Sequence, residues 1–211
     1  MNLYKEFYRK YKKQDIHTIP ISRFNSLHEI IKSLNVEGDT AELGVAFGGT
    51  IKLINHYLKD RTIYAYDTFE GFAALPKEFT KEENKRWKDW GSKDQQLRQW
   101  KEVIKELNTL ENVEIRKGVF PFTADKEKDK TFSFVHIDTD IYFSTMIGLE
   151  FFYPRMVKGG TIVIDDLFKP GDSRFNQVQR AVQHYFKDKG LDYKELVDFR
   201  DNIGHGVIIK G

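Results

Sequence analysis

The chain has 211 residues, 40% of them hydrophobic, and its 34 Lys and Arg residues against 32 Asp and Glu residues leave a net charge of +2. This length suits one domain whose core is large enough to fold without disulfides, and the absence of cysteine excludes disulfides, thiolate metal sites and cysteine nucleophiles. The nearly balanced charge disfavours nucleic-acid and membrane-surface partners, and no run of residues resembles a membrane span or a signal peptide, so we expect a cytoplasmic protein.

Residues 1–37 are predicted to form a helical cap or lid ahead of the sheet. Within residues 1–13, apolar side chains such as Leu3, Phe7 and Tyr11 recur at helical spacing, with Lys and Arg residues between them. A second helix is predicted over residues 24–34. The amphipathic first helix would pack on the body of the protein, close over a site, or join two copies of the chain in a homo-oligomer.

Residues 38–211 alternate short apolar runs with helical patterns, which predicts βαβ units and a mainly parallel, doubly wound α/β sheet. Two closing strands, over 193–197 and 207–209, would form an antiparallel pair. The double glycine at 159–160 is expected to end a helix before the next strand begins. The other predicted strands cover 40–45, 62–66, 113–116, 132–137 and 161–164, and the predicted helices cover 51–58, 143–153 and 175–186.

Residues 71–100 interrupt this alternation with a polar, highly charged stretch. It contains all three tryptophans of the chain, Trp87, Trp90 and Trp100. One interpretation is a solvated helical insertion. The other is an insertion whose large rings cover the active site, and we expect the second because tryptophans are uncommon in a segment this charged.

Ligands of open α/β sheets bind outside the carboxyl ends of the strands. The first strand ends in a glycine-rich turn that matches neither the P-loop nor the GxGxxG pattern. Its glycines would let the backbone approach a ligand, and the following helix N-terminus favours a carboxylate. An acidic residue before the first glycine favours a ligand with a cationic part. The residues concerned are Glu42, Gly44, Gly48, Gly49 and Thr50.

The second strand ends at Asp67, where a carboxylate can accept hydrogen bonds from both hydroxyls of a ribose. The alternative role of Asp67 is a helix N-cap. Together with the glycine turn and Glu42, this residue describes a ligand that has an amino acid at one end and a nucleoside at the other. S-adenosylmethionine is such a ligand.

Four carboxylates follow two predicted core strands, at Asp138, Asp140, Asp165 and Asp166. Like charges this close raise one another's pKa, and a hard divalent cation such as Mg²⁺ would relieve the repulsion. The alternative is a set of helix caps and solvated loop acids.

Two histidines lie near these carboxylates in the sequence. His136, inside the strand, is interpreted as a buried core histidine. His205, in a glycine turn, is a weaker candidate for an acceptor pocket. The chain shows no nucleophile elbow and no Ser-His-Asp ordering.

Five segments, 41–50, 66–71, 117–120, 136–145 and 160–166, resemble the macrocin O-methyltransferase (TylF-type) family of magnesium-dependent sugar methyltransferases. The similarity covers roughly residues 38–185, and Asp-Thr-Phe-Glu-Gly and His-Ile-Asp-Thr-Asp-Ile-Tyr-Phe-Ser-Thr are its most specific segments. It implies the class I methyltransferase fold, a Rossmann-like sheet with an antiparallel last strand. Family members have a longer N-terminal region, so the acceptor is what the resemblance specifies least.

The resemblance also implies roles for particular residues. Asp140 corresponds to the general base, and Asp138, Asp165 and Asp166 correspond to metal ligands. The S-adenosylmethionine site would comprise Glu42, Gly44, Gly48, Gly49, Thr50, Asp67, Gly118 and Asp138, with Gly118 near the adenine.

The predicted function is divalent-metal-dependent methyl transfer from S-adenosylmethionine to a hydroxyl of a sugar or sugar-containing small molecule. One alternative is an enzyme of the same fold that acts on a catechol-like diol or on a nitrogen. Another is a non-catalytic nucleotide-binding module, which the four intact carboxylates disfavour. A nicotinamide-dependent oxidoreductase is disfavoured because the GxGxxG pattern is missing, and an RNA methylase because no basic stripe is present.

Overall fold

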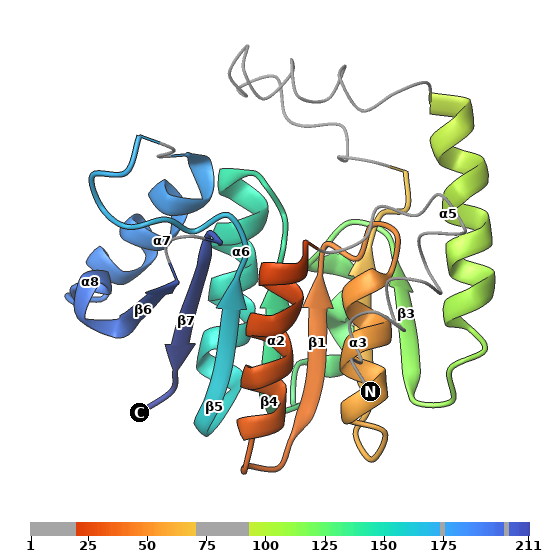
Figure 1. Cartoon of the computed structure of the whole chain (residues 1–211), viewed down its shortest axis with the longest axis horizontal. Coiled ribbons are helices and arrows are strands. Elements are labelled where there is room, and N and C mark those ends of the chain that lie inside the picture. Colours follow the sequence, from red (N-terminus) through yellow and green to blue (C-terminus); the bar gives the residue numbers. More distant parts are fainter. Residues whose placement is uncertain (1–19, 71–92, 174–175, 201–202) are drawn as a thin grey trace.

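The computed structural model describes residues 20–70, 93–173, 176–200 and 203–211 (Figure 1). The helix predicted over 1–13 lies outside these residues, as do Trp87 and Trp90 of the predicted insertion. Trp100 is described and is buried, 4% exposed. It lies on α5 (Lys93–Leu107), a helix that extends into the stretch interpreted as an insertion.

A seven-stranded sheet forms the centre of the molecule, in the order β3-β2-β1-β4-β5-β7-β6 (Figure 1). The first five strands in this order are parallel, whereas β7 runs antiparallel to both β5 and β6. The predicted doubly wound sheet with an antiparallel closing pair is confirmed. The strands are β1 (Asp39–Leu43), β2 (Ile63–Asp67), β3 (Val113–Lys117), β4 (Phe132–Ile137), β5 (Met156–Ile164), β6 (Val197–Arg200) and β7 (His205–Ile209).

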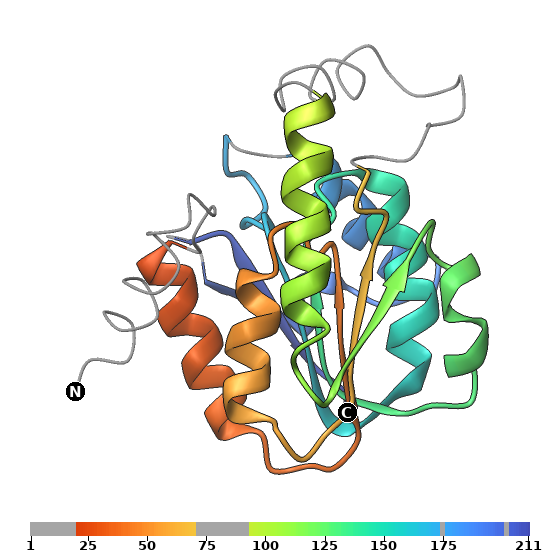
Figure 2. The ribbon, with the colours of Figure 1, turned by 90° about the vertical axis from the view of Figure 1, so that its right-hand side faces the viewer.

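Helices cover both faces of the sheet (Figures 1 and 2). One face packs against α2 (Ile21–Ser33), α3 (Gly49–Tyr57) and α5. The other packs against α6 (Tyr142–Phe152) and α7 (Gln177–Lys187). Shorter turns of helix complete the described chain: η1 (Phe122–Glu127), η2 (Tyr153–Arg155) and α8 (Tyr193–Leu196).

The two-residue period of the strands decides which side chains face which helices. On β4, all six residues are buried. Val135 and Ile137 belong to the core beside α6 and α7, whereas Phe134 belongs to the core beside α2 and α3. His136, two residues after Phe134, therefore faces α2 and α3. By the same rule Glu42 faces them too, because its neighbours Ala41 and Leu43 belong to the opposite core.

Two predicted boundaries are wrong. The strand predicted over 193–197 is instead the short helix α8, because the Asp192 side chain accepts a hydrogen bond from the Lys194 N–H and caps the turn; the strand starts only at Val197. The strand predicted from 161 starts at Met156. The double glycine lies inside it, where the pairing with β4 shifts register, and Gly159 takes a φ of +79°.

Among the described helices, none is both long and apolar enough to cross a membrane.

Candidate active site

The chain reverses its winding between β1 and β4, and this is where open α/β sheets bind ligands. Here Gly44, directly after β1, meets the backbone that follows β4. A Cβ atom on Gly44 would lie 1.8 Å from the Asp138 carbonyl oxygen, and its φ is +93°. The Asp138 N–H donates to the Leu43 carbonyl at 2.8 Å. Only glycine allows both the backbone angle and the close approach.

The glycine turn is held from the end of β2. Asp67 accepts hydrogen bonds from two backbone N–H groups, that of Ala46 in the turn (2.8 Å) and that of Phe69 (2.7 Å). Burial raises the pKa of the Asp67 carboxyl, and these bonds oppose the rise. Gly48 then caps α3 in a left-handed conformation, and Gly49 and Thr50 begin the helix. The predicted cofactor residues of the first two strand ends therefore do meet.

Gly118 follows β3 on the far side of Asp67. Its N–H donates to the Asp67 carbonyl at 2.9 Å, and its φ is +135°. A Cβ atom here would lie 2.8 Å from the Thr123 side chain. The chain beyond β3 is therefore tied to the end of β2.

Glu42 lies inside the protein, with 1% of its surface exposed. Its Oε1 is 2.8 Å from Nδ1 of His136 on the neighbouring strand, and Oε2 has no hydrogen-bond partner. Burial raises the pKa of Glu42, while His136 and the Thr50 hydroxyl oppose the rise. The predicted interior position of His136 is confirmed, because it is 2% exposed.

The carboxylates that follow β4 and β5 gather at one edge of the sheet. Burial raises the pKa of Asp138 well above its ordinary value, and the negative charges of Asp165 and Asp140 raise it further. Asp140 and Asp166 have φ values of 60° and 54°, which turn the chain sharply after each strand. These turns keep Asp138 and Asp140, and likewise the adjacent Asp165 and Asp166, at the same edge of the sheet.

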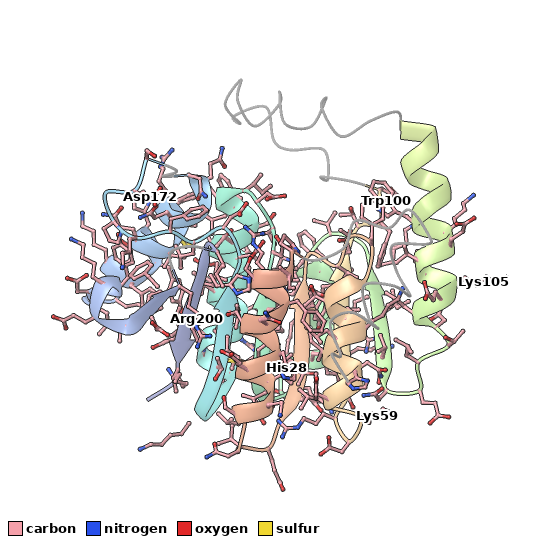
Figure 3. All side chains as sticks on the ribbon, viewed as in Figure 1. His28, Lys59, Trp100, Lys105, Asp172 and Arg200 are labelled. Atoms are coloured by element: carbon pink, nitrogen blue, oxygen red, sulfur yellow. The ribbon has the colours of Figure 1, made fainter. Side chains whose placement is uncertain are left out.

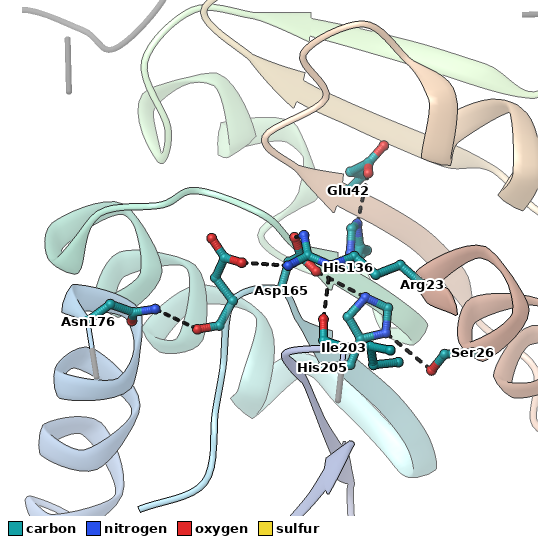
Figure 4. Close-up of polar contacts among 9 residues, drawn as sticks. Arg23, Ser26, Glu42, His136, Asp165, Asn176, Ile203 and His205 are labelled. Carbon is teal, nitrogen blue, oxygen red and sulfur yellow. Dashed lines mark hydrogen bonds and ion pairs between the residues drawn. The ribbon is translucent and has the colours of Figure 1, made fainter. Parts of the chain in front are cut away.

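Arg23 of α2 reaches these carboxylates (Figure 4). Its guanidinium contacts Asp165 through Nη1, contacts Asp166 Oδ1 at 2.6 Å through Nη2, and donates from Nε to the Ile203 carbonyl at 3.0 Å. Burial would raise the pKa of Asp165, but His205 and Arg23 together lower it. No motif in the sequence indicates this contact, because the two ends of the pair are separated by 142 residues.

His205 is the first residue of β7 and is fully buried. Its Nε2 lies 3.0 Å from Asp165 Oδ1, and its Nδ1 lies 3.2 Å from the Ser26 hydroxyl. Burial lowers its pKa, and the neighbouring Asp165 opposes this. His205 has no surface open to solvent, and its polar contacts are with Asp165 and Ser26.

The raised pKa of Asp138 leads to a stability prediction. A carboxyl whose pKa is higher in the folded protein destabilises it increasingly as pH rises above the unfolded value of about 4. We expect Asp138→Asn to raise the melting temperature by a few degrees at pH 7.5 in EDTA, and the gain to shrink toward pH 4. Thermal melts across this range measure the effect.

Asp129→Asn is the matched control, because Asp129 is an exposed aspartate in the turn before β4. It should leave the melting temperature unchanged at every pH. A pH-independent loss of stability in Asp138→Asn would show that the carboxylate is stabilising, contrary to this account.

Comparison with known proteins places the chain among methyltransferases. The family model for macrocin-O-methyltransferase (TylF) matches residues 15–200. A mycinamicin III 3''-O-methyltransferase of Micromonospora griseorubida is 27% identical over 205 residues, covering 86% of this chain and 74% of the relative. A demethyldecarbamoylnovobiocin O-methyltransferase of Streptomyces niveus is 27% identical over 165 residues, covering 71% of this chain and 62% of the relative.

Solved structures show the same fold. The O-methyltransferase NovP superposes with a TM-score of 0.66 at 21% identity, covering 91% of this chain and 81% of that one. The calicheamicin methyltransferase CalS11 gives 0.65 at 17% identity, covering 100% and 94%. With the family match spanning most of the sequence, the chain belongs to the macrocin-O-methyltransferase (TylF) family and is an S-adenosylmethionine-dependent O-methyltransferase.

Proposed function

We propose that this enzyme methylates a hydroxyl of a sugar or sugar-containing small molecule, with a divalent cation bound by its acids and with Asp140 as the general base. The observation that carries the proposal is the gathering of the carboxylates at Asp138, Asp140, Asp165 and Asp166 directly beside the glycine turn. Relatives named for O-methylation of mycinamicin III and of demethyldecarbamoylnovobiocin support a hydroxyl acceptor.

The donor would lie over the turn between β1 and α3. The N-terminus of α3 carries partial positive charge and suits the carboxylate of the methionine part. Asp138 beside Gly44 suits its ammonium group. Asp67 accepts from backbone N–H groups at each of its two oxygens, and each oxygen can also accept from a ribose hydroxyl. Gly118 then lies on the adenine side. Glu42, Gly48, Gly49 and Thr50 complete the proposed site.

The acids fit a hard divalent cation by their chemistry. Burial raises the pKa of Asp138, the negative charges of Asp165 and Asp140 raise it further, and a bound divalent cation would oppose both effects. Arg23 neutralises part of the charge of Asp165 and Asp166, but each carboxylate oxygen keeps lone pairs beyond those contacts. Asp138, Asp165 and Asp166 would hold the ion. When bound, a divalent cation orients vicinal hydroxyls and lowers the pKa of the one that attacks.

Asp140 would accept the proton of the attacking hydroxyl while the methyl group passes from the sulfonium to the oxygen. It lies two residues after Asp138, on a turn that follows the central strand β4. Placing the base and the donor turn on rigid strand ends fixes the reactants relative to each other, and positioning of this kind contributes up to roughly 7–11 kcal/mol. Arg23 of α2, which belongs to the segment 1–37 predicted as a cap, reaches the same edge, and this supports a place for α2 at the site.

The donor site and the metal can be tested separately. We expect S-adenosylhomocysteine to bind in calorimetric titrations both with Mg²⁺ and with EDTA, since Asp138 is the one proposed donor residue that is also a proposed metal ligand. We expect methyl transfer to stop in EDTA and to return with excess Mg²⁺. Asp166→Asn should raise the Mg²⁺ concentration needed for half-maximal rate by about tenfold or more.

Two results would contradict this assignment. Turnover that EDTA does not change would show that the reaction does not use the metal. Failure of S-adenosylhomocysteine to bind in either buffer would show that the proposed donor site is wrong. A panel of sugars, glycosides and catechols then identifies the acceptor. Methylation of catechols but not of sugars would favour the alternative of a flat diol, for which the half-exposed ring of Phe143 at the start of α6 would be a suitable contact.

A further inference from the structure

We infer that His136, Asp165 and His205 form a second metal centre, which binds a divalent transition metal of the zinc class beneath the methyl-transfer site. The three residues come from β4, the end of β5 and β7, and one ligand atom of each lies within 4.8 Å of the other two. They lie on the sheet face covered by α2, the helix that carries His28 (Figure 3), close to Arg23 and Ser26 of that helix (Figure 4). The magnesium site proposed above lies at the strand ends, and Asp165 belongs to both sites.

The three ligand atoms are the ones that the protein leaves without hydrogen bonds. His136 Nε2, Asp165 Oδ1 and His205 Nε2 are all buried and all lack a hydrogen-bond partner. Asp165 Oδ1 and His205 Nε2 lie 3.0 Å apart as a buried His–carboxylate pair, and His136 Nε2 has no partner among the described residues. Buried polar atoms are nearly always satisfied, so an unpartnered His136 Nε2 beside this buried pair needs an explanation. Ligand atoms about 2.0–2.1 Å from a shared zinc ion lie roughly 3.3 Å apart, a separation that falls inside the 4.8 Å that bounds the three atoms here.

Each proposed ligand residue also contacts, through its other polar atom, a second residue that fixes its orientation, as is common for metal ligands. Glu42 accepts from His136 Nδ1 at 2.8 Å, which leaves the Nε2 lone pair facing the centre. The Ser26 hydroxyl holds His205 Nδ1 at 3.2 Å. Arg23 holds the second oxygen of Asp165, so that Oδ1 points at the imidazoles (Figure 4). Such outer contacts fix the orientation and the tautomer of first-row metal ligands.

The donor set selects the class of metal. Imidazole nitrogens favour Zn²⁺, Co²⁺ or Ni²⁺ over Mg²⁺, which prefers oxygen ligands. Two histidines and one carboxylate leave a fourth position of a tetrahedral site for water. Glu42 and Asp165 are both nearly fully buried, and a divalent ion beside them would add to the positive charge that Arg23 places next to Asp165. The ion would join three strands and, through Ser26 and Arg23, the helix α2.

Cobalt is the probe, because tetrahedral Co²⁺ absorbs visible light and Mg²⁺ does not. Metal-free full-length protein is titrated with Co²⁺ in a large excess of Mg²⁺, which keeps the strand-end acids occupied. We expect one Co²⁺ per chain with a visible band, and displacement of that band by one equivalent of Zn²⁺. His136→Asn and His205→Asn should each weaken Co²⁺ binding at least about 100-fold, and Ser26→Ala about tenfold.

His56→Asn is the matched control, since His56 is an exposed histidine on α3, and it should leave the titration unchanged. Asp166→Asn should also keep the cobalt band, which separates this centre from the magnesium site and from the proposed methyl transfer. A wild-type protein that shows no band, or a band that Mg²⁺ removes, overturns the inference whether or not the variants fold. So does a band that persists unchanged in both His136→Asn and His205→Asn.

Discussion

Replacing Asp140 by asparagine is expected to lower kcat by about 10²–10⁴-fold, the usual contribution of a general base. The affinity for S-adenosylhomocysteine should not change, because Asp140 is not one of the proposed donor residues. Single-turnover methyl transfer measures the first quantity and calorimetry the second. The pH profile of the remaining activity should lose the limb that reports the base.

Asparagine is the right substitution here because of the backbone. Asp140 has a φ of 60°, a left-handed conformation that asparagine and aspartate adopt more readily than other side chains. Asp140→Asn therefore removes the charge and keeps the turn, whereas alanine would strain it. Asp129→Asn, at an exposed site, removes the same charge elsewhere and should retain full turnover. If Asp140→Asn turns over as fast as the parent, Asp140 is not the base.

The strands that carry the site were the easiest elements to predict. The runs at 40–45, 62–66 and 132–137 are apolar, short and bounded by polar or glycine residues, and the observed β1, β2 and β4 match them to within two residues. The segment at 193–197 has a similar pattern of Tyr, Leu and Val, but most of it forms the helix α8 because the Asp192 side chain caps its first turn. The hydrophobic pattern predicts that a segment is buried, but here one side-chain hydrogen bond determines whether the segment is a helix or a strand.

The site could be predicted only in part, because some of its contacts depend on strand register and on helix packing. The acids of β4 and β5 could be placed together because they follow adjacent parallel strands. The pairing of Glu42 with His136 depends on strand register, which is visible only once β1 and β4 are known to be neighbours with these two residues opposite each other. Arg23 comes from a helix far away in the chain, and its contact follows from packing of α2 rather than from any spacing of residues.

Gly44, at the end of the first strand, contributes both to the packing of the sheet and to the proposed donor site. Gly44→Ala is therefore expected to lower both the stability of the protein and its binding of S-adenosylhomocysteine. Its φ of +93° costs an L-residue roughly 1–2 kcal/mol. The added methyl carbon would also meet the Asp138 carbonyl oxygen, a backbone atom that cannot turn away as a side chain can. Overpacking adds a further cost of about 1–3 kcal/mol. We therefore expect the free energy of unfolding to fall by about 3 kcal/mol or more, and S-adenosylhomocysteine binding to be lost.

Gly190→Ala separates these two causes. Gly190 also has a positive φ, +69°, but a Cβ atom there meets nothing within 4 Å. It follows α7, and its N–H donates to the Lys187 carbonyl. This control should cost only the roughly 1–2 kcal/mol of backbone strain and should bind S-adenosylhomocysteine normally. Chemical denaturation of both variants, with calorimetry of the ligand, gives the comparison. Equal losses of stability, or normal ligand binding by Gly44→Ala, would show that the contact with Asp138 is not what holds the donor turn in place.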